Sequence, residues 1–284
     1  MKRNELRAML LEQPYDALVL TSEISRRYAT GFHSTAGAVY LSAKQAVFFT
    51  DFRYVEAAHA AIKDFEVREI KAGQSYSALI NELLDEDGAK KVALEDKTLT
   101  YAEFMSWGTA LHATAVRLED GVEQLRMCKE EDEVEKIVAA QRIAEQALEE
   151  VLNDIKVGVT EKEIAARLTY LMLHYGAENM SFDPIVVSGA NSSKPHGVPG
   201  EKTIGAGDFV TMDFGCIYDG YCSDMTRTVA VGHVTDEMQT VYDTCRHHRT
   251  GGKGGEDLHA ETTLRLRTHL HVHLAEYLRE ELHA

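Results

Sequence analysis

The amino-acid sequence predicts two domains of different fold class. Residues 1–123 have the pattern of an α/β domain, because short apolar runs alternate with helical segments along them. Residues 124–244 have the pattern of an α+β domain, because two amphipathic helices come first and antiparallel strands follow. A chain of 284 residues is long enough to bury two cores. Residues 245–284 differ in composition and form a histidine-rich tail.

The first domain is expected to contain a largely parallel sheet, as strands that alternate with helices usually do. An amphipathic helix over residues 1–12 precedes a strand at 17–20. The next two strands, at 38–41 and 46–50, form a hairpin across Ser42–Gln45. The remaining elements are helices at 53–63, 75–85 and 101–112, and strands at 65–70, 91–94 and 115–118.

The second domain begins with two helices, after a charge-rich junction at residues 126–132. Apolar residues at spacings of three and four predict the first helix over about 130–153. Thr160 followed by Glu163 is a capping box, which marks the start of the second helix. A strand interrupted by Pro184 follows, and it leads into the stretch with the most residues able to do chemistry.

The Asp219-Gly220 dipeptide lies between two runs rich in Val, Thr, Phe and Tyr, and it predicts a two-residue hairpin turn. In this register Asp213 faces Thr226, and Asp224 lies two residues before Thr226. Because side chains alternate across a sheet, both aspartates point to one face. That face also carries Thr211, Thr226 and Thr228, whereas the apolar face carries Val210, Met212, Phe214, Met225 and Val229.

Asp213 and Asp224 are candidate metal ligands. Diagonal neighbours on paired strands lie roughly 7–8 Å apart at the backbone, a gap that side chains can close. Two ionised carboxylates this close repel, so either one takes up a proton or a cation lies between them. Two-metal hydrolases hold their ions about 3.5–4 Å apart. The alternative is a surface hairpin with two solvated aspartates, since Asp is common on polar faces.

Several short motifs carry a family resemblance. The second domain contains Ser188 through Asn191 to His196, Gly207-Asp208, Asp213-Phe214-Gly215, Asp219-Gly220-Tyr221 and Ser223-Asp224-Met225-Thr226-Arg227-Thr228. In this order the motifs resemble the metallopeptidases with the pita-bread fold, in particular Xaa-Pro dipeptidases (prolidases) and aminopeptidase P. The first domain resembles the N-terminal domain of creatinases and prolidases in Arg27-Tyr28-Ala29-Thr30-Gly31-Phe32 and Phe49-Thr50-Asp51-Phe52-Arg53-Tyr54. The resemblance covers about residues 15–244.

The resemblance implies a hydrolase that cleaves the bond before proline in dipeptides or short peptides. It implies that Asp213 and Asp224 ligate two divalent metal ions, commonly manganese, cobalt or zinc. It implies that His196 is catalytic, because the matching His binds substrate and helps to stabilise the transition state. The expected partners are a peptide with proline at its second position and a second copy of the chain in a homodimer, which the first domain supports.

The family pattern stops near Thr244, where a pita-bread domain is expected to continue with one metal-binding His, a second His near the substrate and two ligating Glu. We therefore expect weak or incomplete metal binding, and an apolar side of the hairpin that lacks its cover. One hypothesis is that residues 245–284 are out of frame, and a helix with His269 and His273 is predicted there. The alternatives to a peptidase are a non-catalytic binding module or inactive fragment and, ranked last, a metal-independent creatinase-like hydrolase.

Composition narrows the classes of partner and compartment. A net charge of −16 argues against binding to nucleic acid or to an anionic membrane through general electrostatics. The four cysteines form no C-x-x-C pair, which fits a reducing compartment. The N-terminus is charged throughout, and no run of 18 apolar residues exists, so no signal peptide or membrane span is expected. The expected location is the cytoplasm.

Overall fold

The computed structural model describes residues 2–250, and it divides into two compact units, Met1–Lys129 and Glu130–Ala284. Each unit has its own hydrophobic core, as the sequence predicts. The predicted boundary after residue 123 falls inside helix α6 (Gly121–Met127), which was not expected. Val122 is buried in the core of the first unit and Leu125 packs against that core, so this helix belongs with the first unit.

The first unit contains one six-stranded sheet with the order β4-β3-β2-β1-β5-β6. Three neighbouring pairs of strands are parallel, and the pairs β1·β2 and β2·β3 are antiparallel. The expectation of a largely parallel sheet is therefore corrected to a mixed sheet, because the predicted hairpin across Ser42–Gln45 and the antiparallel pairing of β1 with β2 both lie within it. The strands are β1 (Ala17–Leu20), β2 (Ala38–Ser42), β3 (Ala46–Thr50), β4 (Glu66–Glu69), β5 (Lys91–Leu94) and β6 (Thr114–Arg117).

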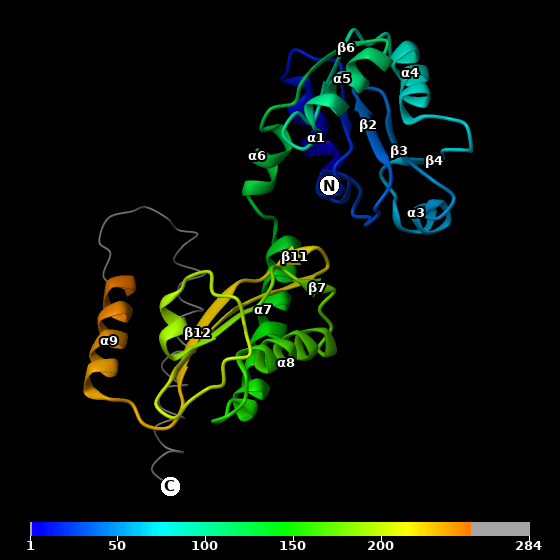
Figure 1. The fold of residues 1–284 in the computed structure, drawn as a ribbon. Coiled ribbons are helices and arrows are strands. Elements are labelled where there is room, and N and C mark those ends of the chain that lie inside the picture. Colours follow the sequence, from blue (N-terminus) through cyan, green and yellow to red (C-terminus); the bar gives the residue numbers. More distant parts are fainter. Residues whose placement is uncertain (1, 251–284) are drawn as a thin grey trace. The chain divides into compact units, whose positions relative to one another are not determined.

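Helices cover both faces of this sheet (Figure 1). In β1 the side chains of Leu18 and Leu20 belong to one apolar cluster, and those of Ala17 and Val19 belong to another. This alternation means that the central strand is buried on both faces, which explains its continuous apolar run. Besides α6, the helices are α1 (Lys2–Leu11), α2 (Glu23–Thr30), α3 (Val55–Ala61), α4 (Tyr76–Asp87) and α5 (Tyr101–Ala110).

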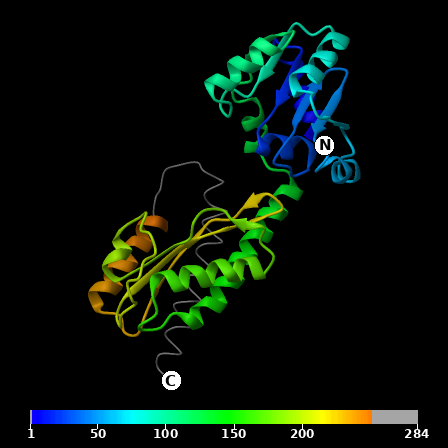
Figure 2. The ribbon, with the colours of Figure 1, turned by 45° about the vertical axis from the view of Figure 1, so that its right-hand side comes forward.

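The second unit packs two helices along one face of a twisted set of strands (Figures 1 and 2). Helix α7 (Glu131–Val151) and helix α8 (Glu161–His174) both begin with a capping box, and in α8 this is the predicted pair Thr160 and Glu163. A short 3-10 turn, η1 (Leu152–Asp154), ends the first of them. The remaining elements are β7 (Asn179–Met180), β8 (Ile185–Ser188), η2 (Gly189–Ser193), β9 (Phe209–Phe214), β10 (Cys216–Tyr218), β11 (Tyr221–Cys222), β12 (Met225–Ala230) and α9 (Asp236–Thr250).

The apolar side of the hairpin is covered, contrary to expectation. Val210, Met212 and Phe214 are fully buried, and they share one core with Leu148 of α7 and Leu168 of α8. The two helices supply the cover that was expected from the missing part of the family pattern. The face of the sheet that is only partly buried is therefore the polar one, which carries the candidate metal ligands.

Helix α9 runs from Asp236 to Thr250 and so continues across the predicted boundary between residues 244 and 245. The helix predicted over 261–283, with its His269 and His273 pair, lies outside the described residues. Within residues 2–250, no helix combines the length and the apolar character that crossing a membrane requires. Cys128, Cys216 and Cys222 are free thiols, as the absence of paired spacing predicts.

Candidate functional site

The two-residue turn predicted at Asp219-Gly220 is present. Both residues have positive φ, 45° and 79°, which is the backbone of the turn type that best matches the twist of paired strands. The strand pairing has two parts, with a gap between them at Gly215 and Asp224. Tyr218 pairs with Tyr221 in the part next to the turn, and Asp213 pairs with Thr226 in the other part. The predicted register therefore holds along the whole hairpin.

Asp213 lies on the polar face of the central strand β9, where it is half-buried. Its Oδ1 atom accepts a hydrogen bond of 2.7 Å from the hydroxyl of Thr226, directly across the ladder. Further along the same face, the hydroxyls of Thr211 and Thr228 lie 3.0 Å apart and form a second cross-strand hydrogen bond. The polar face thus carries two successive cross-strand hydrogen bonds, and the one nearer the turn involves the carboxylate of Asp213.

Asp224 is exposed and immediately precedes β12. The backbone beside it is held tightly, because the Ser223 N–H donates to the carbonyl of Cys216 at 2.9 Å. The two sides of the hairpin approach so closely here that a Cβ atom on Gly215 would lie 2.0 Å from the Ser223 carbonyl oxygen. Only glycine fits opposite Asp224, and this close approach fixes the backbone from which the second carboxylate projects.

His196 is exposed in a turn between η2 and β9. The Lys194 N–H donates to the Asn191 carbonyl at 3.0 Å, and the Gly197 N–H donates to the Lys194 carbonyl at 3.1 Å. Gly197 is buried, and a Cβ atom there would lie 2.6 Å from a methyl group of Val187 on β8. The turn that carries His196 is therefore pressed against the strand next to β9.

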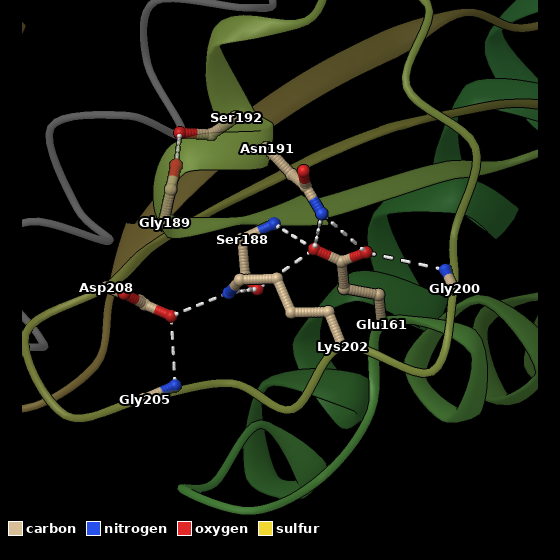
Figure 3. Close-up of polar contacts among 9 residues, drawn as sticks. All are labelled: Glu161, Ser188, Gly189, Asn191, Ser192, Gly200, Lys202, Gly205 and Asp208. Carbon is tan, nitrogen blue, oxygen red and sulfur yellow. Dashed lines mark hydrogen bonds and ion pairs between the residues drawn. The ribbon is translucent and has the colours of Figure 1, made fainter.

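Sequence reasoning missed a buried carboxylate beneath this segment (Figure 3). Glu161, the first residue of α8, has no exposed surface. Its Oε1 atom accepts hydrogen bonds from the N–H of Ser188 at 2.7 Å, from the Ser188 hydroxyl at 3.0 Å and from the Asn191 amide at 3.1 Å. Its Oε2 atom accepts a longer hydrogen bond of 3.4 Å from the Gly200 N–H.

Lys202 extends this network towards β9 (Figure 3). Its ammonium group donates to the Ser188 hydroxyl at 2.6 Å and to Oδ2 of Asp208 at 3.1 Å, while the Gly205 N–H donates to the same oxygen at 2.9 Å. Burial alone would raise the pKa of Asp208, but these two hydrogen bonds and the charge of Lys202 outweigh it and lower the pKa. Asp208 is therefore held as a carboxylate just before β9.

The signal for this network is present in the sequence only in part. Ser188, Asn191 and Asp208 belong to the motifs that carry the family resemblance, yet local patterns assign them no role. Glu161 looks like an ordinary acidic residue in the first turn of a helix, where such residues favour the helix dipole. Its contacts become visible only when the segment from 188 to 202 is folded onto α8.

Asp213 and Asp224 fit a divalent cation in the chemistry of their donor atoms, since hard cations prefer carboxylate oxygens. In the part of the chain that the structure describes, no three or more His, Cys, Asp or Glu side chains converge on a common point. A metal ion at this site would therefore have at most two such side-chain ligands from residues 2–250, fewer than the six or so ligands that such ions usually take.

Comparison with known proteins gives consistent matches in both units. Residues 2–128 match the model of the creatinase/prolidase N-terminal domain, and residues 135–252 match that of metallopeptidase family M24. The uncharacterized peptidase YqhT of Bacillus subtilis (strain 168) is 39% identical over 243 residues, which are 85% of this chain and 68% of that protein.

Solved structures agree with these matches. A Xaa-Pro dipeptidase from Bacillus anthracis superposes with a TM-score of 0.83 at 39% identity, covering 89% of this chain and 71% of that one. An X-Pro aminopeptidase from Thermotoga maritima superposes with a TM-score of 0.81 at 33% identity, covering 88% of this chain and 70% of that one.

Proposed function

Because the chain belongs to metallopeptidase family M24, we propose that it is a metal-dependent peptidase that hydrolyses the bond before proline in dipeptides or short peptides. The expected fold, a creatinase-like α/β domain followed by part of a pita-bread α+β domain, is confirmed. The observation that carries the proposed activity is the hairpin register. Asp213 pairs with Thr226, and Asp224 lies two residues before Thr226, so the same pairing places both aspartates on one face. The names of the Bacillus anthracis and Thermotoga maritima structures support the preference for Xaa-Pro substrates.

In this proposal Asp213 and Asp224 hold two divalent ions, for which manganese, cobalt and zinc are the candidates. When bound, such ions supply a nucleophile at neutral pH by lowering the pKa of a water molecule. Thr226 orients the carboxylate of Asp213 through its hydrogen bond of 2.7 Å. His196 donates a hydrogen bond to the substrate carbonyl, where negative charge develops in the transition state. We propose further that the protein acts as a homodimer in the cytoplasm.

The second candidate function is a non-catalytic binding module of the same fold. The favouring observation is that the proposed metal ligands number only two, Asp213 and Asp224, and that no group of three or more His, Cys, Asp or Glu side chains converges among residues 2–250. Such a module would keep the fold and the segment that carries His196, and it would bind peptides without hydrolysing them.

One experiment separates the two candidates. The purified full chain is assayed against a Xaa-Pro dipeptide with and without added manganese, and its metal content is measured by elemental analysis. The control substrate is the same dipeptide with alanine in place of proline. Bound metal with manganese-dependent cleavage of the Xaa-Pro substrate alone supports the peptidase. Protein that holds no metal and cleaves neither substrate contradicts it and favours the binding module.

A further inference from the structure

The buried carboxylate of Glu161 gathers both ends of the segment from residue 188 to residue 200. Its hydrogen-bond donors are Ser188 at the start of the segment, Asn191 near its start and Gly200 at its end. In Figure 3 these donors converge on the carboxylate from the side opposite to α8. A single side chain thus bonds to both ends of the loop.

A chain of hydrogen bonds leads from Glu161 to the turn that contains His196. The side-chain amide of Asn191 donates to Glu161, while its side-chain oxygen accepts from the Lys194 ammonium at 2.8 Å. The main-chain carbonyls of Asn191 and Lys194 then accept the N–H groups that form the turn up to Gly197. His196 lies inside that turn, so its backbone position depends on where Asn191 is held.

The same network fixes the strands beneath the proposed metal ligands. Ser188 ends β8, which pairs with β9 so that Ile185 lies opposite Asp213 and Ser188 opposite Val210. Lys202 joins the Ser188 hydroxyl to the carboxylate of Asp208, the residue just before β9. Ser188 and Lys202 both bond to Glu161 at the start of α8, and Lys202 also bonds to Asp208. The loop and the strand that carries Asp213 are thereby connected to the same residue of α8.

We propose that Glu161 is a positioning residue, which holds the segment 188–200 on α8 and thereby sets His196 relative to Asp213. A catalytic role for His196 rests on the proposed function, but the positioning itself does not. A buried carboxylate carries a desolvation cost that a well-packed apolar residue avoids. An apolar residue in place of Glu161 would leave the donors on Ser188, Asn191 and Gly200 without an acceptor. The contribution of the carboxylate is therefore to fix the position of the segment.

Main-chain contacts make the proposal testable in a folded protein. The N–H groups of Glu161 and Lys162 donate to the carbonyls of Lys202 and Gly200, at 3.0 and 3.1 Å. These bonds do not involve the Glu161 side chain, so its replacement leaves α8 attached to the segment 200–202. Glu161→Gln keeps an acceptor oxygen for Ser188 and Asn191 and loses the acceptor for Gly200, whereas Glu161→Ala loses all of them.

The matched control is Glu163→Ala. Glu163 lies in the same first turn of α8, is exposed, and accepts hydrogen bonds from the N–H and the hydroxyl of Thr160, both at 2.8 Å. Its replacement weakens the capping box of the helix without touching the segment 188–200. General loosening of the helix start is thereby separated from loss of the Glu161 contacts.

Hydrogen exchange on the full chain, followed by mass spectrometry, measures the effect. We expect Glu161→Ala to raise exchange in peptides covering residues 188–200 by about tenfold or more, Glu161→Gln by less, and Glu163→Ala to leave it within about twofold. The imidazole resonance of His196, assigned with His196→Gln, should shift or broaden in both Glu161 variants and stay unchanged in Glu163→Ala.

The proposal is overturned if Glu161→Ala, or Glu161→Gln should the alanine variant not fold, leaves both the exchange and the His196 resonance as in the parent protein. It is equally overturned if Glu163→Ala changes them as much. Neither readout depends on turnover or on bound metal. A loosened segment in a chain that cleaves no Xaa-Pro peptide would therefore contradict the proposed function and leave the positioning role intact.

Discussion

The hydroxyl of Thr226 donates a hydrogen bond of 2.7 Å to Oδ1 of Asp213, across the antiparallel strands that the Asp219-Gly220 turn joins. Asp213 Oδ1 thus accepts a hydrogen bond from the protein itself, and this bond orients the carboxylate. Groups that orient a metal ligand in this way typically account for 10–100-fold in metal affinity.

Replacement of Thr226 tests this orienting role. Thr226→Val keeps the branched shape and removes the donor, so we expect manganese affinity to fall about tenfold. Calorimetric titration with manganese measures the affinity, and thermal unfolding checks that the hairpin is intact. Thr228→Val is the control, because the Thr228 hydroxyl bonds to the Thr211 hydroxyl on the same face. Equal affinities in the parent and Thr226→Val would contradict the role.

The two proposed metal ligands should be indispensable for any metal-dependent activity. Asp213→Asn and Asp224→Asn each remove one carboxylate charge, and we expect each to abolish manganese-dependent cleavage of Xaa-Pro dipeptides. Asp219→Asn is the control, since it sits in the turn and pairs with Lys136 at 2.9 Å, an exposed contact worth at most about 1 kcal/mol. Full activity in either ligand variant would remove that residue from the site.

The close approach at Gly215 should make it intolerant of any side chain. A Cβ atom there would lie 2.0 Å from the Ser223 carbonyl oxygen and 2.5 Å from the Ser181 hydroxyl, so Gly215→Ala should lower the free energy of unfolding by about 3 kcal/mol. Urea denaturation measures the loss. Gly200→Ala is the control, because within residues 2–250 no atom beyond its chain neighbours lies within 4 Å of its added Cβ, and it should change stability by less than about 1 kcal/mol.

The Asp208 carboxylate should make stability depend on pH in the acid range. Its pKa is lowered in the folded chain, so its contribution is fully present above the unfolded value of about 3.9 and is lost as the pH falls through the folded value. Asp208→Asn should therefore be less stable than the parent at pH 6, and the difference should shrink below about pH 4.

Urea unfolding midpoints between pH 6 and pH 3 measure this dependence. Glu201→Gln is the control, since Glu201 is mostly exposed and pairs with Lys162, which is also exposed. Its midpoint should follow that of the parent at every pH. A constant difference between Asp208→Asn and the parent would show that the lowered pKa contributes nothing.

Local rules explain which parts of the site the sequence could predict. The Asp219-Gly220 turn requires only two adjacent residues, and the register of Asp213 then follows by counting. The capping box of Thr160 and Glu163 is equally local. These elements were predicted correctly because their determinants lie within a few residues of each other.

Contacts between distant residues explain what the sequence could not predict. Glu161 meets Ser188 and Gly200 across separations of 27 and 39 residues, and no local pattern marks such a meeting. The antiparallel pairing of β1 with β2 likewise depends on how the chain returns after α2. Helix α2 itself was missed because its buried side chains include the polar residues Ser25 and Arg26, which do not read as a core-facing stripe.

The unbroken register between Asp213 and Asp224 also limits how this stretch of chain can vary in length. Because neighbouring side chains point to opposite sides, adding or removing one residue within either paired strand between them would turn one carboxylate into the apolar interior and expose a core residue in exchange. Insertions in this hairpin are therefore tolerable only in pairs or at its tip, and the number of residues from each aspartate to the turn is as tightly constrained as the two acids themselves.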